Sequence, residues 1–225
     1  MDKVLIVAAV SVAGLVVVAV VHSFLRRAAA KRLAALTHVA ADLGFDFAPA
    51  DAAALPEEFA GYWLFAHGDT KRSSNHFRGT TADLDVLIFD YRYTTGHGKN
   101  RQTHQQTIVR FRHAELDLPR FTLRPESFWH KVGALFGASD INFDSHPGFS
   151  KAYLLKGNRE DAIRALFSEP VLDYFQERRG LCVEANDGDL LFYRDGERAK
   201  IDRYREFLEE GFEVFGLFRA APPTA

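Results

Sequence analysis

The sequence is poor in the residues that make covalent cross-links and zinc sites. Cys182 is the single cysteine among 225 residues, which excludes a disulfide within the chain and zinc motifs built on cysteine pairs. The HExxH helix of zinc hydrolases is missing too, although the chain has nine histidines. We therefore expect neither a metal nor a cofactor, and we expect Cys182 to be a small buried group on a strand.

The chain also lacks the excess of positive charge that binding to nucleic acid requires. Of its 28 basic residues five precede position 33, and of its 30 acidic residues one does, so the chain from Leu33 onward carries a formal charge of −6. Such an acidic body has no large basic face with which to neutralise phosphates. We expect no nucleic-acid partner.

One long apolar run stands out against this background. Val4 to Val21 is interrupted only by Ser11 and Gly14, which membrane helices tolerate. As a helix the run spans about 27 Å, close to the thickness of a bilayer's hydrocarbon core. The sequence predicts a transmembrane anchor that contacts the lipid bilayer through residues 4–21. The alternatives are a cleaved secretory signal, for which the run is long and the basic start poor, and a buried core helix.

Cations flank this run mainly on one side. Only Lys3 precedes it, whereas four cations follow it closely: Arg26, Arg27, Lys31 and Arg32. Because cytoplasmic flanks of membrane helices carry the excess of Lys and Arg, we expect the N-terminus outside and the C-terminal domain in the cytoplasm. The basic collar also suits anionic headgroups.

Periodicity in the rest of the chain predicts one α+β domain with a mostly antiparallel sheet and several helices. Leu84–Thr94 and Thr103–Arg112 alternate like two strands of a hairpin, with the glycine-containing loop 95–101 between them. Further short strands are expected at Tyr62–Ala66, Asn75–Arg78, Phe121–Leu123, Phe149–Leu155, Leu181–Ala185 and Leu190–Arg194. Helices are expected at Phe24–Leu43, at 125–136 with Pro125 in the first turn, at Arg159–Phe167, at Pro170–Arg179 and at Ala199–Glu210.

These elements divide the chain into four parts. We expect an anchor over residues 1–23, a basic juxtamembrane helix and linker over 24–56, the cytoplasmic domain over 57–219 and a disordered tail over 220–225.

Several short stretches together resemble a family of proteins. They are Asn75–Gly79, Ile88–Tyr93, Gln105–Val109, Asp140–Pro147 and Arg164–Phe167. In these stretches the chain is similar to uncharacterised bacterial single-pass membrane proteins with an N-terminal helix and a cytoplasmic α+β domain. The resemblance covers most of the chain after Leu43. It implies a bacterial source and hence the inner membrane, and it transfers no activity or catalytic residue.

Asp90 is the first residue that could carry chemistry, because it lies between Phe89 and Tyr91 in an apolar strand. Burial there could raise its pKa and suit it to general acid or base catalysis. Alternatively it is a structural carboxylate, paired with a neighbour such as Arg92 or Arg110 or bonded to backbone amides. No second carboxylate or nucleophile can be tied to it from sequence, so we expect no catalytic residue.

The loop between the two hairpin strands is the second candidate. Gly96-His97-Gly98-Lys99-Asn100 departs from the phosphate-binding P-loop in its glycine spacing and in the strand that follows it. The loop nevertheless offers His97, Lys99 and Arg101 for contact with an anion or a partner, and His104 follows on the next strand. His104 and His113 are separated by an odd number of residues, which places them on opposite faces of the sheet and disfavours a shared metal.

Three functions are compatible with these features. The first is a membrane-tethered interaction or scaffold domain with a protein partner at the membrane. The second is a membrane-associated, hydrolase-like enzyme that uses Asp90 with His97 or His104. The third is a domain that senses anionic headgroups through Lys99, Arg101 and the collar.

Overall fold

Apolar residues at helical spacing, followed by a glycine, determine where the first helix ends. The computed structural model describes residues 2–49, 59–114, 116–126, 140–186 and 188–219, with side chains from position 16 onward. Helix α1 runs from Asp2 to Leu43 and stops at Gly44, whose φ of +72° is a left-handed conformation that favours glycine. The end of the predicted stalk helix at Leu43 is confirmed.

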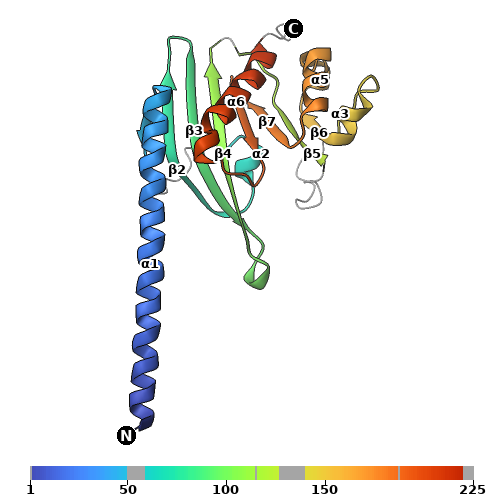
Figure 1. Cartoon of the computed structure of the whole chain (residues 1–225). Helices are drawn as coiled ribbons and strands as arrows, with labels where there is room; N and C mark the ends of the chain where they lie inside the picture. Colours follow the sequence, from blue (N-terminus) through green and yellow to red (C-terminus); the bar gives the residue numbers. More distant parts are fainter. Residues whose placement is uncertain (1, 50–58, 115, 127–139, 187, 220–225) are drawn as a thin grey trace.

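Helix α1 has two different parts. Near its C-terminal end Leu36 and Ala40 are fully buried against the sheet. The N-terminal part projects away from the body of the molecule as a long rod (Figure 1). Immediately after the helix, strand β1 (Asp46–Ala48) pairs with β2, so part of the expected linker is an edge strand of the sheet. Residues 50–58 of that segment lie outside the described part of the chain.

The predicted hairpin is confirmed. Strands β3 (Leu84–Thr95) and β4 (Gln102–His113) pair without a shift from Leu84↔His113 to Thr95↔Gln102. The tip that joins them contains one turn of 3-10 helix, η2 (Gly98–Asn100). Strand β2 (Asp69–Thr80) pairs with β3 and is much longer than the predicted strand at Asn75–Arg78.

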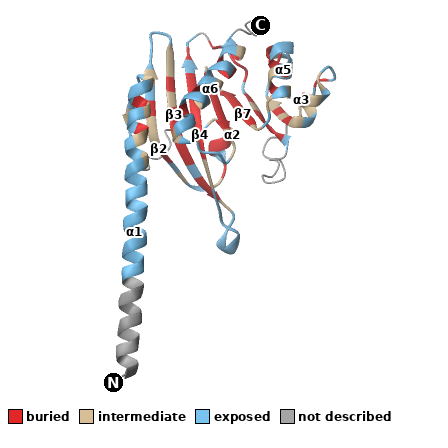
Figure 2. Cartoon of the chain, viewed as in Figure 1, coloured by how far each residue is buried: buried red, intermediate tan, exposed pale blue. Residues whose placement is uncertain are grey.

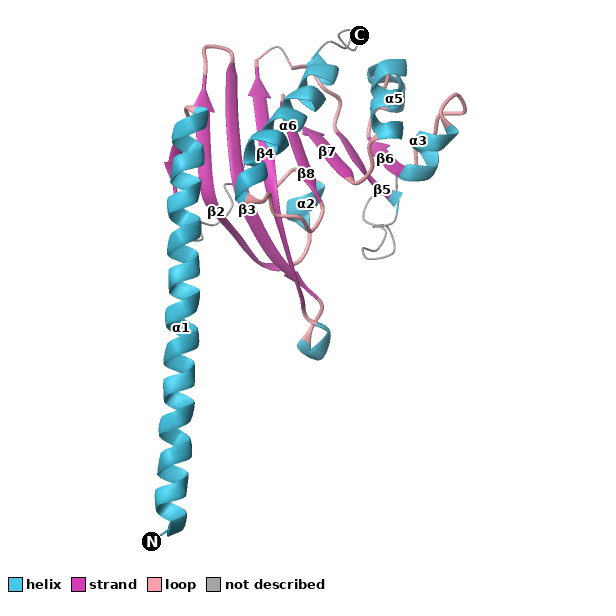
Figure 3. Cartoon of the chain, viewed as in Figure 1, coloured by secondary structure: helices cyan, strands magenta, loops and turns pink. Residues whose placement is uncertain are grey.

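The sheet has eight strands in the order β1-β2-β3-β4-β8-β7-β5-β6, and every neighbouring pair is antiparallel. This confirms the α+β class with an antiparallel sheet (Figure 3). The remaining strands are β5 (Phe121–Pro125), β6 (Tyr153–Gly157), β7 (Leu181–Asn186) and β8 (Asp189–Arg194). The remaining helices are α2 (Trp63–Ala66), α3 (Pro147–Ala152), α4 (Glu160–Leu166), α5 (Glu169–Glu177), η4 (Ile201–Arg203) and α6 (Tyr204–Arg219).

Alternation along the strands builds a separate apolar layer on each face of the sheet. Val86 and Ile88 of β3 belong to the larger layer, which is covered by α3 to α6 and by the end of α1. Phe89 and Tyr91 belong to the smaller layer, which α2 covers. The buried residues therefore form a continuous band through the sheet (Figure 2). Aromatic residues make up most of the smaller layer and more than a third of the larger one, as expected for a chain with 20 phenylalanines.

Four local predictions are wrong. Tyr62–Ala66 is not a strand, because Trp63–Ala66 forms helix α2. The first half of the expected strand Phe149–Leu155 belongs to helix α3, and Pro125 ends strand β5 instead of beginning a helix. The last helix starts at Tyr204 and continues to Arg219, well beyond Glu210. The helix expected near residues 127–136 lies outside the described residues.

The membrane span falls largely outside the residues whose side chains are described. From position 16 onward, no helix in the described part of the chain is long and apolar enough to cross a membrane. Positions 4–15 of the predicted span are not among those side chains.

Candidate functional site

Strand alternation turns Asp90 toward the larger apolar layer, on the face of the sheet that carries α1 and α6. Its side chain is only 5% exposed, although it is ionisable. It lies where five elements meet: β3, its neighbours β2 and β4, the stalk helix α1 and the segment that leads into α6. A carboxylate in such a place needs several donors to offset the loss of water.

Asp90 has these donors. Thr107 donates to one carboxylate oxygen over 2.6 Å, and Asn75 donates to the other over 2.8 Å. Arg198 forms a close charged hydrogen bond with the same oxygen as Asn75, and Arg32 of α1 approaches that oxygen to 3.5 Å. The carboxylate thus connects the stalk helix, the sheet and the segment before α6 in one network.

The electrostatics of Asp90 do not match those of a general acid. Burial acts to raise its pKa, but the hydrogen bond and charge of Arg198, with the hydrogen bonds from Thr107 and Asn75, outweigh burial and hold the pKa below its ordinary value. The structural interpretation is therefore the better one, but with different partners from those expected. Arg110 bonds Asp85 over 2.6 Å instead of Asp90.

The collar cations divide into two groups. Arg26, Arg27 and Lys31 are exposed on the projecting rod of α1. Arg32 is turned toward the domain, where it reaches Asp90. Three of the four cations are therefore exposed, and the fourth helps attach the stalk helix to the domain.

The hairpin tip brings three of the candidate residues together. His97 precedes η2, Lys99 lies within it and Arg101 follows it, and all three are exposed. The Arg101 guanidinium donates to the Thr70 hydroxyl over 3.0 Å, which ties the tip to strand β2. The tip extends toward the same side of the molecule as the projecting rod of α1 (Figure 1).

His104 does not share a site with Asp90. Its ring stacks on Tyr93, its partner across the hairpin, with 4.8 Å between ring centroids, and it bonds the Thr95 hydroxyl over 2.8 Å. Tyr93 belongs to the smaller apolar layer, so His104 and Asp90 lie on opposite faces of the sheet. His113 packs against Phe215 of α6, which confirms that His104 and His113 point to opposite faces. The geometry therefore separates Asp90 from His104 by the sheet, which contradicts this pairing of the hydrolase-like hypothesis.

A second buried carboxylate holds helix α2 on the smaller layer. Glu184 is fully buried and accepts hydrogen bonds from the amide groups of Trp63 and Leu64, over 2.6 and 3.1 Å, and from the Tyr193 hydroxyl over 2.8 Å. Burial raises the pKa of Glu184 despite these donors and the nearby Arg124. The Arg124 guanidinium lies over the Trp63 ring, 3.4 Å from its centroid. This arrangement attaches α2 to the smaller layer.

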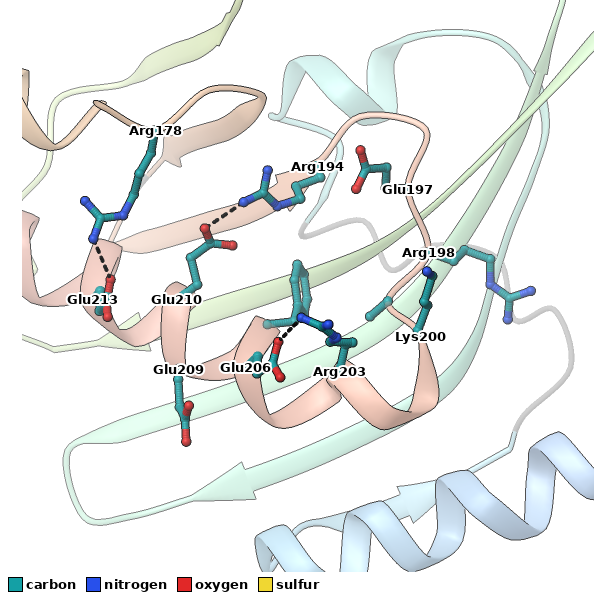
Figure 4. A pocket seen from close by; sticks show the side chains of 12 residues that line it. Arg178, Arg194, Glu197, Arg198, Lys200, Arg203, Glu206, Glu209, Glu210 and Glu213 are labelled. Atoms are coloured by element: carbon teal, nitrogen blue, oxygen red, sulfur yellow. Dashed lines mark hydrogen bonds and ion pairs between the residues drawn. The ribbon is translucent and has the colours of Figure 1, made fainter. Parts of the chain in front are cut away.

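A groove of about 600 Å³ runs along α6 and the segment before it. Its walls carry charges that largely pair with each other: Arg194 with Glu210 over 2.7 Å and Arg203 with Glu206 over 2.7 Å (Figure 4). Arg198 links the groove to Asp90. Among the described residues that line it there is no serine, cysteine or histidine, and its ionisable side chains are arginines, one lysine and glutamates.

Cys182 is fully buried on β7, as expected, and burial raises the pKa of its thiol to about 12. A thiol in this state is unreactive. No cluster of three or more potential ligands that could hold a metal ion occurs among the residues the structure describes.

Sequence reasoning missed Thr107, which lies opposite Asp90 across the hairpin, and three members of the network that come from other elements. Asn75 lies in a break of the β2 register with a φ of +54°, a conformation that Asn adopts more readily than most residues. Arg198 and Arg32 are distant in sequence from Asp90 and look like ordinary surface cations. No local sequence pattern indicates that any of these three residues contacts Asp90.

The comparisons with known proteins concern the fold alone. No family model matches the chain, and no curated protein matches it. Among solved structures, the architecture is similar to that of a mycobacterial transport factor. That structure is the crystal structure of trehalose monomycolate transport factor A, TtfA, with a TM-score of 0.59 and 12% sequence identity, covering 84% of this chain and 96% of the TtfA chain. At this identity the likeness shows a shared fold.

Proposed function

We propose that this chain is a membrane-tethered interaction domain without catalytic activity of its own, which holds a protein partner at the inner membrane of a bacterial cell. The observation that carries the proposal is the exposure of the α1 rod. Seven apolar side chains between Val16 and Leu25 are 51% to 71% exposed. A continuous apolar surface of this kind is rare on a protein that is surrounded by water, and a lipid bilayer would cover it.

The direction of the stalk supports this assignment. The buried residues Leu36 and Ala40, together with the Arg32–Asp90 contact, fix the end of α1 to the domain. The apolar run continues from the opposite end of the same helix. The exposed Arg26, Arg27 and Lys31 lie between the two, where they would meet the headgroups of the cytoplasmic leaflet.

The absence of an evident catalytic constellation in the described residues favours an interaction role over an enzyme. TtfA, which has a similar fold, is described as a trehalose monomycolate transport factor. We infer that the partner is a membrane protein and that the stalk keeps the domain beside it. The charged groove along α6 is the surface that we assign to the partner.

Membrane attachment is tested by alkaline extraction of membranes that contain the full chain. We expect the wild type to stay in the pellet and Val10→Glu/Val12→Glu, at the middle of the proposed span 4–21, to enter the supernatant, because each charge at the centre of a spanning helix costs about 3 kcal/mol of insertion. The matched control, Ala30→Glu/Ala34→Glu, changes two exposed positions of the same helix outside the run. Extraction of the wild type, or equal release of both variants, would contradict the anchor.

The partner is tested with a photo-crosslinking residue at Glu209, in the groove, and with the same residue at Lys151, on α3. We expect one reproducible product in native membranes from position 209, weakened by charge reversal of Arg194, and none from position 151. Equal products from both positions, or none from either, would argue against a partner in the groove.

A further inference from the structure

The distal half of the β3–β4 hairpin differs in charge from the acidic body. From Tyr91 to Gln106, the part of the hairpin beyond Asp90, the sequence has three cations, Arg92, Lys99 and Arg101, and no carboxylate. Lys99 and Arg101 are exposed at the tip, with His97 beside them. The carboxylate that strand pairing brings nearest is Asp69, opposite Thr94, and it is followed by Lys71 and Arg72 on β2. The tip therefore presents net positive charge.

The tip also reaches to the level of the membrane boundary expected from α1. Because Arg32 contacts Asp90, distances along the hairpin and along the stalk helix can be measured from the same starting level. From Asp90 to Thr95 the strand advances about 17 Å, and from Arg32 to Val21 the helix advances about 17 Å. Both run toward the same side of the molecule, and the tip lies level with the lower part of the exposed stretch of α1 (Figure 2). The end of the hairpin thus lies near the level at which the apolar run begins.

The backbone of the tip is organised before any ligand binds. Gly96 has a φ of +74°, and a side chain there would meet the Asn100 carbonyl oxygen at 2.4 Å. The Arg101 guanidinium is held by the Thr70 hydroxyl. Holding Arg101 in this way reduces the entropy that a surface contact has to overcome.

We propose that the hairpin tip is a second, electrostatic contact with the bilayer, in which Lys99 and Arg101, with His97 beside them, bind anionic lipid headgroups. The proposal rests on the proposed function, because the stalk must first place the tip at the membrane. With two contact points, the stalk and the tip, the domain is held at a defined tilt instead of swinging about one helix. Anionic lipid then regulates which surface of the domain faces a partner.

The test uses the full chain in lipid nanodiscs, with Asn100→Cys carrying a fluorescent donor and a headgroup-labelled lipid as acceptor. The native Cys182 is fully buried and stays unlabelled. We expect higher energy transfer in discs that contain phosphatidylglycerol than in discs of phosphatidylcholine alone, and a decrease as salt is added.

Substitutions separate charge from structure. Lys99→Gln/Arg101→Gln should lower the docked-to-undocked ratio about thirty-fold, or about five-fold for each cation. Arg101→Lys keeps the charge and should retain most of the transfer, although it loses the planar guanidinium. The matched control is Lys151→Gln/Arg159→Gln, which removes two exposed cations on α3 and before α4 and should leave the transfer unchanged.

The outcomes distinguish this proposal from the one on which it depends. A chain that does not stay with the discs overturns the anchor and the tip contact together. A chain that stays but gives equal transfer with both lipids overturns only the tip contact, as does a control pair that lowers transfer as much as the tip pair.

Discussion

Arg32 of the stalk helix and Asp90 in the middle of the sheet lie 3.5 Å apart, although 58 positions separate them in the sequence. Arg198, 108 positions from Asp90, bonds the same carboxylate oxygen. One buried carboxylate therefore connects the element proposed to enter the membrane with the wall of the charged groove along α6. This connection makes Asp90 the most informative single position to change.

Asp90→Asn should destabilise the folded chain by about 2–3 kcal/mol. The amide keeps the shape but leaves the two arginines without a counter-charge and turns one acceptor into a donor. Urea unfolding of the full chain in detergent measures the loss. Arg32→Ala should cost less than about 1 kcal/mol, since its contact is long and its side chain is 29% exposed.

The control for this experiment is Arg203→Ala, which breaks an exposed pair with Glu206 in the same part of the chain. Such a pair is worth at most about 0.5 kcal/mol. If Arg198→Ala costs no more than Arg203→Ala, the central role of Asp90 is wrong.

The depressed pKa of Asp90 predicts that the free energy of unfolding decreases in acid. Because the folded pKa lies below the unfolded value of 3.8, the unfolded chain binds a proton first as the pH falls. The contribution of Asp90 is therefore complete above about pH 5 and is lost as the pH falls below 3.8 toward the folded pKa. Unfolding free energies measured from pH 7 downward should fall more steeply for the wild type than for Asp90→Asn. If the unfolding free energies of the two proteins fall in parallel with pH, the depressed pKa of Asp90 is contradicted.

Features that depend on local spacing could be predicted from the sequence. The alternation in Leu84–Thr95 and Gln102–His113 determines both the hairpin and which side chains share a face. Thr107 is the cross-strand neighbour of Asp90 in that hairpin, but the other partners, residues 32, 75 and 198, could not be predicted, because only the folded chain brings them together. The expectation that Arg92 or Arg110 would pair with Asp90 relied on sequence proximity, and Arg110 turns to the other face.

The misassigned segment Tyr62–Ala66 has a similar cause. A short run of aromatic and apolar residues is compatible with a strand or a helix when periodicity is the only guide. Here the Glu184 carboxylate, 121 positions from Trp63, accepts the free amide groups at the start of α2. This long-range contact favours the helix, since amide groups in a first turn need acceptors from outside the helix.

Glu184→Gln should therefore destabilise the chain by about 1–3 kcal/mol, because the amide nitrogen would face a backbone donor. The pH dependence has the opposite sign from that of Asp90. The folded pKa of Glu184 is raised by burial, so wild-type stability falls as the pH rises above the unfolded value of 4.5. The Gln variant lacks this titration, and the gap between the two proteins should narrow with rising pH. If the difference in unfolding free energy widens with rising pH instead, the hydrogen-bond donors outweigh burial in setting the pKa of Glu184.

Two glycines in the hairpin tip provide a matched pair of positions. Gly96 and Gly98 both have positive φ, +74° and +56°, but a side chain at 96 would clash with the Asn100 carbonyl oxygen whereas position 98 has nothing within 4 Å. Gly98→Ala should cost only the conformational strain, about 1 kcal/mol, and Gly96→Ala should add a steric cost of about 1–3 kcal/mol. Because the tip is remote from both apolar layers, hydrogen exchange should reveal the loss as faster opening of amides near residues 94–103, with the central strands unchanged. Equal exchange in the two variants would mean that the close approach at Gly96 does not shape the tip.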